Sequence, residues 1–342
     1  MEIKEKESVK YIKKKKIGNS DFILIFREIR SLLTIYQKSE YLIQKNDIYL
    51  DKKKSEVIFS FPNEGIDLHN LINTKVFDYK SMHGLIKWIM FQILKGLETL
   101  NSLNIIHRDI NPKNILISSL GRIKIIGFSR SINDIESKFV EDRVVGTICY
   151  IAPEVLFLQN YNSKIDIWAA GVIMLELYLK KSYALRFNED DTNEDYSKRF
   201  FKQLKFLANK LKVPFNFTEG NYNIDNLINW LANDANFIQE EFDKFCDEIP
   251  GLEEEGKKLL QRLLTFNPKE RISAKEALKM PYFQAYQPFN KDEFKKKKDK
   301  GANENMTNFL KNLEKEYQKI NNNYPNEKKK EIFLNELSKI LS

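Results

Sequence analysis

Two long stretches of this 342-residue chain are apolar on nearly every side, and they constrain the fold more than any other feature. The first is GLIKWIMFQILKGLETLNSL at 84–103, and the second is KIDIWAAGVIMLELYL at 164–179. A helix that is hydrophobic all round has no face to give to solvent, so other elements must surround it. Neither stretch has the roughly 18 uncharged apolar residues of a membrane span. Both therefore predict helices inside a sizeable folded domain.

The residues before these helices alternate between strand and helix patterns. SVKYIKKKKI (8–17) predicts a strand, and NSD (19–21) offers N-cap residues to a helix whose apolar residues recur at helical spacing. YLIQKNDIYLD and SEVIFSF, separated by KKK, predict two more strands. Farther along, NILIS and RIKII predict a small hairpin. The first 61 residues therefore predict strand, helix, strand, strand, ahead of a mainly helical remainder.

Charge and composition exclude several classes of protein. The formal net charge is 56 − 48 = +8, and most of the excess lies in short lysine runs. Such runs are more typical of a solvated surface than of a nucleic-acid site. Cys149 and Cys246 have neither metal-ligand nor disulfide spacing, which favours a reducing compartment, and no apolar segment follows the charged N-terminus. We therefore expect an intracellular protein, cytoplasmic or nuclear, with no nucleic-acid and no membrane partner.

Four motifs carry the chemistry, and they keep a fixed order along the chain. They are HRDINPKN (107–114), GTICYIAPE (146–154), DIWAAG (166–171) and NPKERISAKEALKMPYF (267–283). They resemble, in turn, the catalytic loop, the end of the activation segment, the buried central helix and the C-terminal signature of eukaryotic protein kinases. FREIRSLL also resembles the regulatory helix of the cyclin-dependent kinases. This resemblance concerns residues 9–285.

The resemblance implies the α+β, two-lobed protein kinase fold with a mainly helical C-lobe. We expect a reduced N-lobe at 1–61, lacking the first two strands and the glycine-rich loop, and a C-lobe with hinge and activation segment at 62–288. A charged helical extension is predicted at 289–342. Its apolar residues recur at helical spacing and predict an interaction element: Leu310, Leu313, Tyr317 and Ile320.

Four positions match residues that perform phosphoryl transfer in the family. Lys13 matches the strand lysine that holds the α- and β-phosphates, and Glu28 matches its partner on the regulatory helix. Asp109 matches the base that orients the substrate hydroxyl, and Asn114 matches a metal ligand. Phosphoryl transfer depends mostly on positioning and charge neutralisation. An active enzyme would therefore use ATP and Mg²⁺, with Asn114 as a metal ligand.

Other positions depart from the family where the metal and the phosphates bind. Gly127 stands in place of the magnesium-binding aspartate, so that GFS replaces Asp-Phe-Gly. Mg²⁺ is a hard cation that prefers carboxylate oxygen, and Asn114 offers one neutral oxygen. Asn111 replaces a lysine and removes a positive charge from the transferring phosphoryl group.

The adenine site is altered as well. Aligning VIFSF places Phe59 at the gatekeeper and Pro62 where the family donates a backbone N–H to adenine, which proline lacks. Tyr11 falls two residues before Lys13, where the family has a small alanine, and strand alternation points both side chains to one face. The twelve residues before Lys13 contain no glycine, so the glycine-rich loop is absent.

Positions that maintain the shape of a kinase match the family. Three match the hydrophobic spine that joins the lobes: Leu32, His107 and Phe128. Glu154 and Arg271 match a buried ion pair of the C-lobe, whose disruption would cost about 3–5 kcal/mol. Asp166 matches the aspartate that holds the backbone of the catalytic loop.

The activation segment carries a possible regulatory charge. Glu141 falls near the position of the activating phosphothreonine of cyclin-dependent kinases. Arg27 and Arg108 match two of the arginines that would receive that phosphate. A carboxylate at Glu141 would mimic it through charge-assisted hydrogen bonds, and a solvated VEDR loop is the equally supported alternative.

These substitutions predict a pseudokinase that acts as a scaffold or allosteric regulator of a protein partner: a kinase, a cyclin-like subunit or a substrate protein. No cofactor is expected for such a protein. The alternative is an active Ser/Thr kinase with atypical metal use, or one whose gene model lacks its true N-terminus. A glycine-rich loop encoded upstream would favour that alternative.

Overall fold

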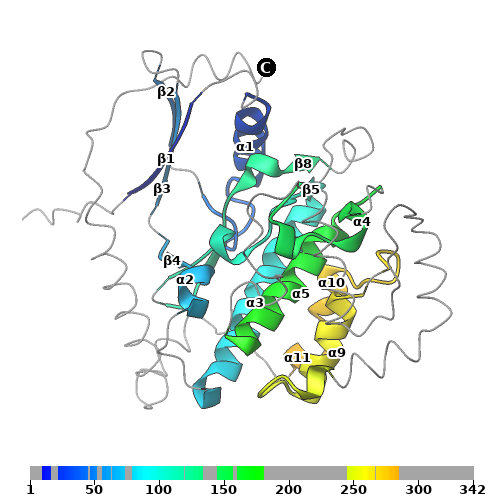
Figure 1. Cartoon of the computed structure of the whole chain (residues 1–342). Helices are drawn as coiled ribbons and strands as arrows, with labels where there is room; N and C mark the ends of the chain where they lie inside the picture. Colours follow the sequence, from blue (N-terminus) through cyan, green and yellow to red (C-terminus); the bar gives the residue numbers. More distant parts are fainter. Residues whose placement is uncertain are drawn as a thin grey trace, which may run out of the picture.

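The computed structural model has two lobes, with a strand-rich lobe above a helical one (Figure 1). The predicted extension, 289–342, and the stretch 196–243 lie outside the described residues. The structure describes 10–16, 22–44, 47–51, 56–62, 64–73, 79–118, 120–133, 145–156, 160–180, 245–265 and 267–284.

The N-lobe is a three-stranded antiparallel sheet with one helix. Its strand order is β1-β3-β2, and α1 (Phe22–Ile35) stands beside the sheet (Figure 1). The strands are β1 (Lys10–Lys16), β2 (Asp47–Asp51) and β3 (Glu56–Pro62). The spacing of apolar residues on α1 explains its orientation, because Ile25, Ile29 and Leu32 are buried while Leu33 is exposed.

The predicted strand over 41–51 is only half right. Residues 47–51 pair with β3, but Leu42 forms a parallel bridge with Ile125 of the lower lobe. The backbone N–H of Ile43 donates to the Ile125 carbonyl at 3.0 Å, and that of Ile125 donates to the Tyr41 carbonyl at 2.9 Å. Hydrogen bonds to the other lobe therefore divide the apolar run into two segments.

The C-lobe is built around α3 (Tyr79–Ser102) and α5 (Lys164–Leu179), which pack against each other (Figure 1). Every residue of α5 from Ile165 to Tyr178 is buried, as its uniformly apolar sequence predicts. The other helices described here are α2 (Leu68–Asn73), α4 (Pro153–Leu156), α9 (Glu254–Leu263), α10 (Ala274–Ala277) and α11 (Pro281–Gln284). Within the described part of the chain, no helix is both long and apolar enough to cross a membrane.

Short strands and 3₁₀ turns follow α3 and carry the HRDINPKN and GTICYIAPE motifs, and one further short strand, β4, precedes α3. The predicted hairpin is present as β6 and β7, in a sheet of order β4-β6-β7, and β5 pairs with β8. The strands are β4 (Ile66–Asp67), β5 (Ile105–Ile106), β6 (Ile115–Ile117), β7 (Ile123–Ile125) and β8 (Ile132–Asn133). The 3₁₀ turns are η1 (Pro112–Asn114), η2 (Phe128–Arg130) and η4 (Ile148–Tyr150).

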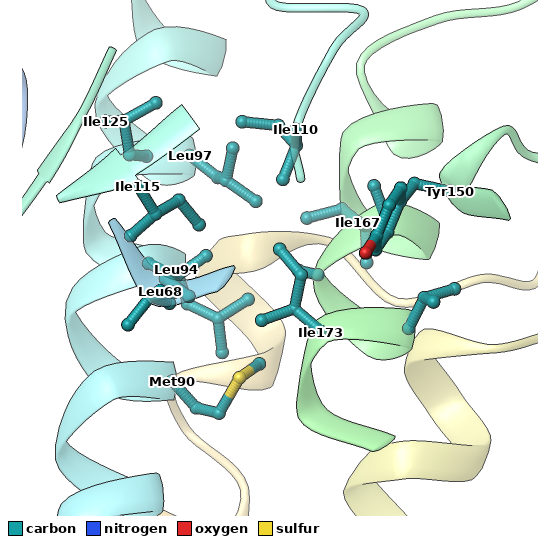
Figure 2. Packing of buried hydrophobic residues seen from close by; sticks show 14 of the residues in the cluster. Leu68, Met90, Leu94, Leu97, Ile110, Ile115, Ile125, Tyr150, Ile167 and Ile173 are labelled. Carbon is teal, nitrogen blue, oxygen red and sulfur yellow. The ribbon is translucent and has the colours of Figure 1, made fainter. Parts of the chain in front are cut away.

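A single apolar core supports these turns from below. Met90, Leu94 and Leu97 of α3 face Ile167 and Ile173 of α5, and the residues that flank the catalytic loop pack above them (Figure 2). Ile110, inside that loop, and Ile115, directly after it, are at most 2% exposed. Buried isoleucines therefore anchor the loop at its middle and at its end.

Candidate active site

One buried carboxyl group holds the backbone of the catalytic loop. Asp166, at the start of α5, accepts hydrogen bonds from the backbone N–H groups of His107 (2.8 Å) and Arg108 (3.0 Å). Burial raises the pKa of Asp166 to about 7, although both N–H groups and the Arg108 charge act in the opposite direction. Arg108 has a φ of 63°, a left-handed conformation that costs a non-glycine residue about 1–3 kcal/mol. The Asp166 hydrogen bonds offset that strain.

The predicted spine residues meet at the junction between the lobes. The ring of His107 contacts that of Phe128 edge-on, with centroids 4.9 Å apart, and its Nε2 lies 2.8 Å from the Ile126 carbonyl oxygen. Phe128 and Leu32 are at most 1% exposed, and α1 packs against η2. A buried Ser31–Ser131 hydroxyl pair, with its oxygens 2.6 Å apart, joins the same two elements. The regulatory helix is thus tied directly to the start of the activation segment.

Asp109 lies at the centre of a network of donors. Its Oδ1 accepts from the Thr147 hydroxyl at 2.8 Å and from Asn111 Nδ2 at 3.0 Å. Its Oδ2 accepts from Asn114 Nδ2 at 3.2 Å and lies 3.3 Å from Nη1 of Arg130. Both carboxylate oxygens are therefore engaged, although the side chain is 15% exposed.

Asn111 does more than remove a positive charge. Its Nδ2 also donates to the Asp109 carbonyl at 3.0 Å and to the Thr147 hydroxyl at 3.2 Å. Its Oδ1 accepts from the backbone N–H of Lys113 at 3.0 Å and caps η1. A lysine has donors but no acceptor, so it could not make that last bond. Both the nitrogen and the oxygen of the Asn111 carboxamide are therefore hydrogen-bonded within the site.

At Gly127, the Asn114 side chain occupies the space that a side chain would need. Gly127 has a φ of +85°, and a Cβ built there would lie 2.6 Å from Cγ and 3.0 Å from Nδ2 of Asn114. Non-bonded atoms do not approach so closely, and L-residues rarely adopt this φ. The Asn114 carboxamide therefore lies directly beside position 127, with its Nδ2 turned toward Asp109.

Glu28 has a lysine partner on β1. Lys15 Nζ lies 3.0 Å from Glu28 Oε2, and the two side chains are 20% and 2% exposed. Of Lys13 and Tyr11, only the backbone is described. Residues 13 and 15 share one face of β1, so alternation alone cannot choose between them. The structure therefore adds Lys15 as a partner of Glu28, and the matches of Lys13 to the strand lysine and of Tyr11 to the adenine roof stay predictions.

The hinge begins where β3 ends. Phe59 is fully buried and lies opposite Lys13, and Pro62 is the last residue of β3 and lies opposite Lys10. Since proline has no N–H, this position cannot donate a backbone hydrogen bond to a ligand. The loss of an adenine donor at Pro62 remains a prediction from the alignment.

The regulatory arginines have other neighbours in the described structure. Arg108 is 4% exposed, its Nε donates to the Arg130 carbonyl at 2.6 Å, and its Nη1 donates to the Tyr161 hydroxyl at 2.9 Å. Arg27 is half-buried on α1. Glu141 lies outside the described residues, so its pairing with these arginines stays a prediction.

Glu154 and Arg271 form a bidentate, fully buried ion pair. Nη1 lies 2.6 Å from Oε1 and Nη2 lies 2.9 Å from Oε2. The guanidinium also donates to the carbonyls of Thr265 (2.8 Å) and Lys164 (3.0 Å) and lies over the Trp168 ring at 5.2 Å. These contacts tie the activation segment to α5 and to the segment before α10.

The sequence reasoning missed three residues of this site. Lys15 lies inside the predicted strand SVKYIKKKKI, Thr147 lies inside the GTICYIAPE motif, and Arg130 directly follows the GFS motif. A positive charge three residues after a missing metal ligand is the one signal that could have singled out Arg130.

Comparison with known proteins agrees with this geometry. A profile of the protein kinase domain matches residues 2–283. Mitogen-activated protein kinase 17 of Arabidopsis thaliana is 30% identical over 292 residues, which cover 80% of this chain and 56% of that protein. Cyclin-dependent kinase 4 of Xenopus laevis is 34% identical over 198 residues, 58% of this chain and 56% of the relative.

A solved structure shares the fold. The crystal structure of the yeast RNA Pol II CTD kinase CTDK-1 complex contains a chain that superposes with a TM-score of 0.60 at 23% identity, over 81% of this chain and 86% of that one. This chain spans a little over half the length of the curated relatives that it matches. The chain belongs to the protein kinase family and resembles its mitogen-activated and cyclin-dependent members.

Proposed function

We propose that this chain is a pseudokinase, a protein kinase domain that regulates or scaffolds a partner protein without transferring phosphate. The observation that carries the proposal is the absence of a carboxylate at residue 127. Gly127 supplies no carboxylate, and the Asn114 side chain fills the space beside it. A catalytic kinase needs a metal-binding aspartate there, because charge neutralisation is a main part of phosphoryl transfer.

The residues present do not fit Mg²⁺. This ion requires near-octahedral oxygen coordination, usually with at least one free carboxylate. Asp109 already accepts from Thr147, Asn111 and Asn114 and is paired with Arg130. Among the described residues, no three His, Cys, Asp or Glu side chains cluster as a metal site would require.

The phosphate and adenine positions support the same proposal. Asn111 brings no positive charge to a transferring phosphoryl group, and electrostatic stabilisation is usually the largest catalytic contribution. Pro62 offers no N–H at the hinge. We therefore expect weak or absent binding of ATP, with no cofactor needed for the protein's role.

One observation favours the alternative, an active Ser/Thr kinase with atypical metal use. The Lys15–Glu28 ion pair is formed, at 3.0 Å, and Ser31 and Ser131 hold α1 against η2. An ion pair between the β1 lysine and the regulatory helix is a contact that a catalytic kinase also needs, and this supports the alternative. In a pseudokinase the same contacts fix the shape that a partner would recognise, and for this reason we rank the alternative second.

The proposed partner is a protein: another kinase, a cyclin-like subunit or a substrate protein. The similarity to a cyclin-dependent kinase, and to a kinase solved as a complex, supports a protein partner. We place the protein in the cytoplasm or nucleus, as for an intracellular signalling protein.

Nucleotide binding by the purified protein tests the proposal. A ligand at 100 times its Kd stabilises a protein by about 2.7 kcal/mol, which raises the melting temperature visibly. We expect millimolar Mg-ATP to produce no such rise in the wild type. A rise that depends on Mg²⁺ would contradict the proposal.

A transfer assay with radiolabelled ATP completes the test. Wild type, Asp109→Ala and the repaired double variant Gly127→Asp/Asn111→Lys are compared side by side. We expect no labelling by any of them, because an aspartate at the left-handed position 127 would be strained and the hinge would still contain Pro62. Wild-type labelling that disappears in Asp109→Ala would identify an active kinase.

A further inference from the structure

The N-lobe sheet places β1 at one of its edges. The strand order is β1-β3-β2, so among the strands that the structure describes β1 has a neighbour on one side alone. Each residue of β1, Lys10–Lys16, has a register partner on β3. In an antiparallel pair, successive residues direct their N–H and C=O groups alternately toward the partner strand and away from it. Alternate residues of β1 therefore direct their backbone groups to the outer edge, where a further strand can pair.

The same strand is strongly basic. Its sequence, KYIKKKK, contains five lysines and no acidic residue. Lys15 is used inside the lobe, because its Nζ lies 3.0 Å from Oε2 of Glu28. Positions 10 and 16 lie on the opposite face of the strand from position 15, since successive residues alternate. Lys10, Lys13 and Lys16 recur at every third residue, so positive charge is distributed along the whole edge.

Charge decides which kind of strand can join this edge. Opposite charges across neighbouring strands stabilise the pair, and like charges destabilise it. Two copies of β1 placed edge to edge would bring lysines against lysines, and edge lysines are a common protection against such self-pairing. An acidic strand would instead bring carboxylates opposite the lysines. The edge therefore discriminates against a second β1 and in favour of an acidic segment.

We propose that the outer edge of β1 binds an extended acidic segment of a partner protein, which joins the N-lobe sheet as an additional strand. In strand addition, main-chain hydrogen bonds supply affinity and the side chains of the added segment supply specificity. A segment with an acidic residue at every third position matches Lys10, Lys13 and Lys16. The inference rests on the proposed function, in which this chain holds a protein partner, and it adds the surface and the chemistry that hold the partner.

Synthetic peptides as long as β1 test the proposal on the purified wild-type chain. The probe is Glu-Val-Val-Glu-Val-Val-Glu with blocked ends, because valine favours strands and the glutamates repeat the spacing of the lysines. Glu-Pro-Pro-Glu-Pro-Pro-Glu keeps the charge but lacks most of the backbone N–H groups that a strand needs. Lys-Val-Val-Lys-Val-Val-Lys keeps the strand propensity and reverses the charge. Fluorescence anisotropy of labelled peptides measures binding, and hydrogen exchange reports on the backbone amides of β1.

A pair of matched variants locates the binding site. Lys10→Glu/Lys16→Glu reverses the charge at both ends of the edge and leaves the Lys15–Glu28 pair in place. Lys275→Glu/Lys279→Glu is the control, because both lysines are exposed in the C-lobe and the net charge changes by the same amount. Circular dichroism checks folding. If the edge variant does not fold, Lys10→Gln/Lys16→Gln replaces it, and the three peptides still test the wild type.

We expect the acidic valine peptide to bind the wild type and to slow amide exchange in β1. The proline and lysine peptides should bind at least about tenfold more weakly. Lys10→Glu/Lys16→Glu should weaken binding of the acidic valine peptide by a similar factor, because two attractive cross-strand pairs become repulsive. Lys275→Glu/Lys279→Glu should bind this peptide as the wild type does.

Several results would overturn the proposal. If the acidic valine peptide does not bind at millimolar concentration, or binds without slowing exchange in β1, the edge is not its site. Equal binding of the valine and proline peptides would mean charge attraction without strand addition. Equal losses in the two protein variants would mean a general effect of net charge.

A second copy of the chain is the other possible occupant, because β2 forms the opposite edge of the sheet and has an aspartate at each end. Self-association that slows exchange in β1 without any peptide would assign the edge to this second copy and contradict the proposal. The proposed function fails by a different result, Asp109-dependent labelling from Mg-ATP in the wild type.

Discussion

The C-lobe frame and the phosphate side of the catalytic loop use polar groups in opposite ways. Glu154 and Arg271 are buried charges that satisfy each other completely. Across the loop, Asn111 and Asn114 are neutral, and both donate to Asp109. The frame therefore depends on a charge pair that cannot lose one partner, whereas the phosphate side is a network of hydrogen bonds from neutral donors to one carboxylate, together with one ion pair.

The largest expected effect lies in the frame. Glu154→Ala leaves the Arg271 guanidinium buried without its carboxylate, and breaking such a pair costs about 3–5 kcal/mol of unfolding free energy. Denaturant unfolding measures the loss. Glu255→Ala is the control, because it removes an exposed i,i+3 pair with Lys258 and should change stability little. Equal losses in both variants would mean that the buried ion pair stabilises the frame no more than an exposed one.

The pH dependence of the unfolding free energy tests how the buried Asp166 carboxyl group contributes to the frame. Its folded pKa of about 7 lies above the ordinary 3.8, because burial disfavours the carboxylate. The folded state then binds more protons than the unfolded chain between these values, so the Asp166 contribution to stability is greatest below pH 3.8 and falls as pH rises toward 7. Urea unfolding of wild type and Asp166→Asn across this range measures the difference. A wild-type advantage that grows with pH would contradict the assignment.

Two glycines allow a matched test of position 127. Gly127→Ala places a Cβ against Asn114 at a φ of +85°, and we expect a loss of about 1–3 kcal/mol from strain at this left-handed position. Gly84→Ala adds a Cβ in open space on α3, where alanine should stabilise by about 0.5–1 kcal/mol. Opposite signs in thermal unfolding are expected. The same sign in both would mean that Asn114 moves away freely.

The smallest expected effect is at the junction of the lobes. Ser31→Ala removes one hydroxyl of the buried Ser31–Ser131 pair, and the Ser131 hydroxyl keeps its bond to the Phe128 carbonyl. We expect a loss of about 1 kcal/mol, the usual net value of one hydrogen bond. Hydrogen exchange of α1 should rise more than that of α5, with exposed Ser102→Ala as the control. Unchanged exchange in α1 would show that the pair does not hold the helix.

The sequence by itself determined the kinase fold and the framework of the site. Uniformly apolar segments became α3 and α5, and the ordered motifs located the catalytic loop, Asp166 and the Glu154–Arg271 pair. The two helices could be predicted because their apolar pattern is local in the chain. The residue pairs could be predicted because the kinase family motifs indicate which residues are partners. The predicted strand over 41–51 was wrong in its first half because the partner of Leu42 is Ile125, which lies far away in the sequence.

Tertiary structure alone decided which charges meet. Four consecutive lysines end β1, and only the position of α1 beside the sheet gives Lys15 to Glu28. The pairing of Arg130 with Asp109 depends on the η2 turn that Arg108 anchors, and only the folded chain brings the Asn114 side chain beside Gly127. Such ion pairs and side-chain positions depend on the distances between backbone segments in the folded chain. Hydrophobic periodicity and motif spacing carry no information about those distances.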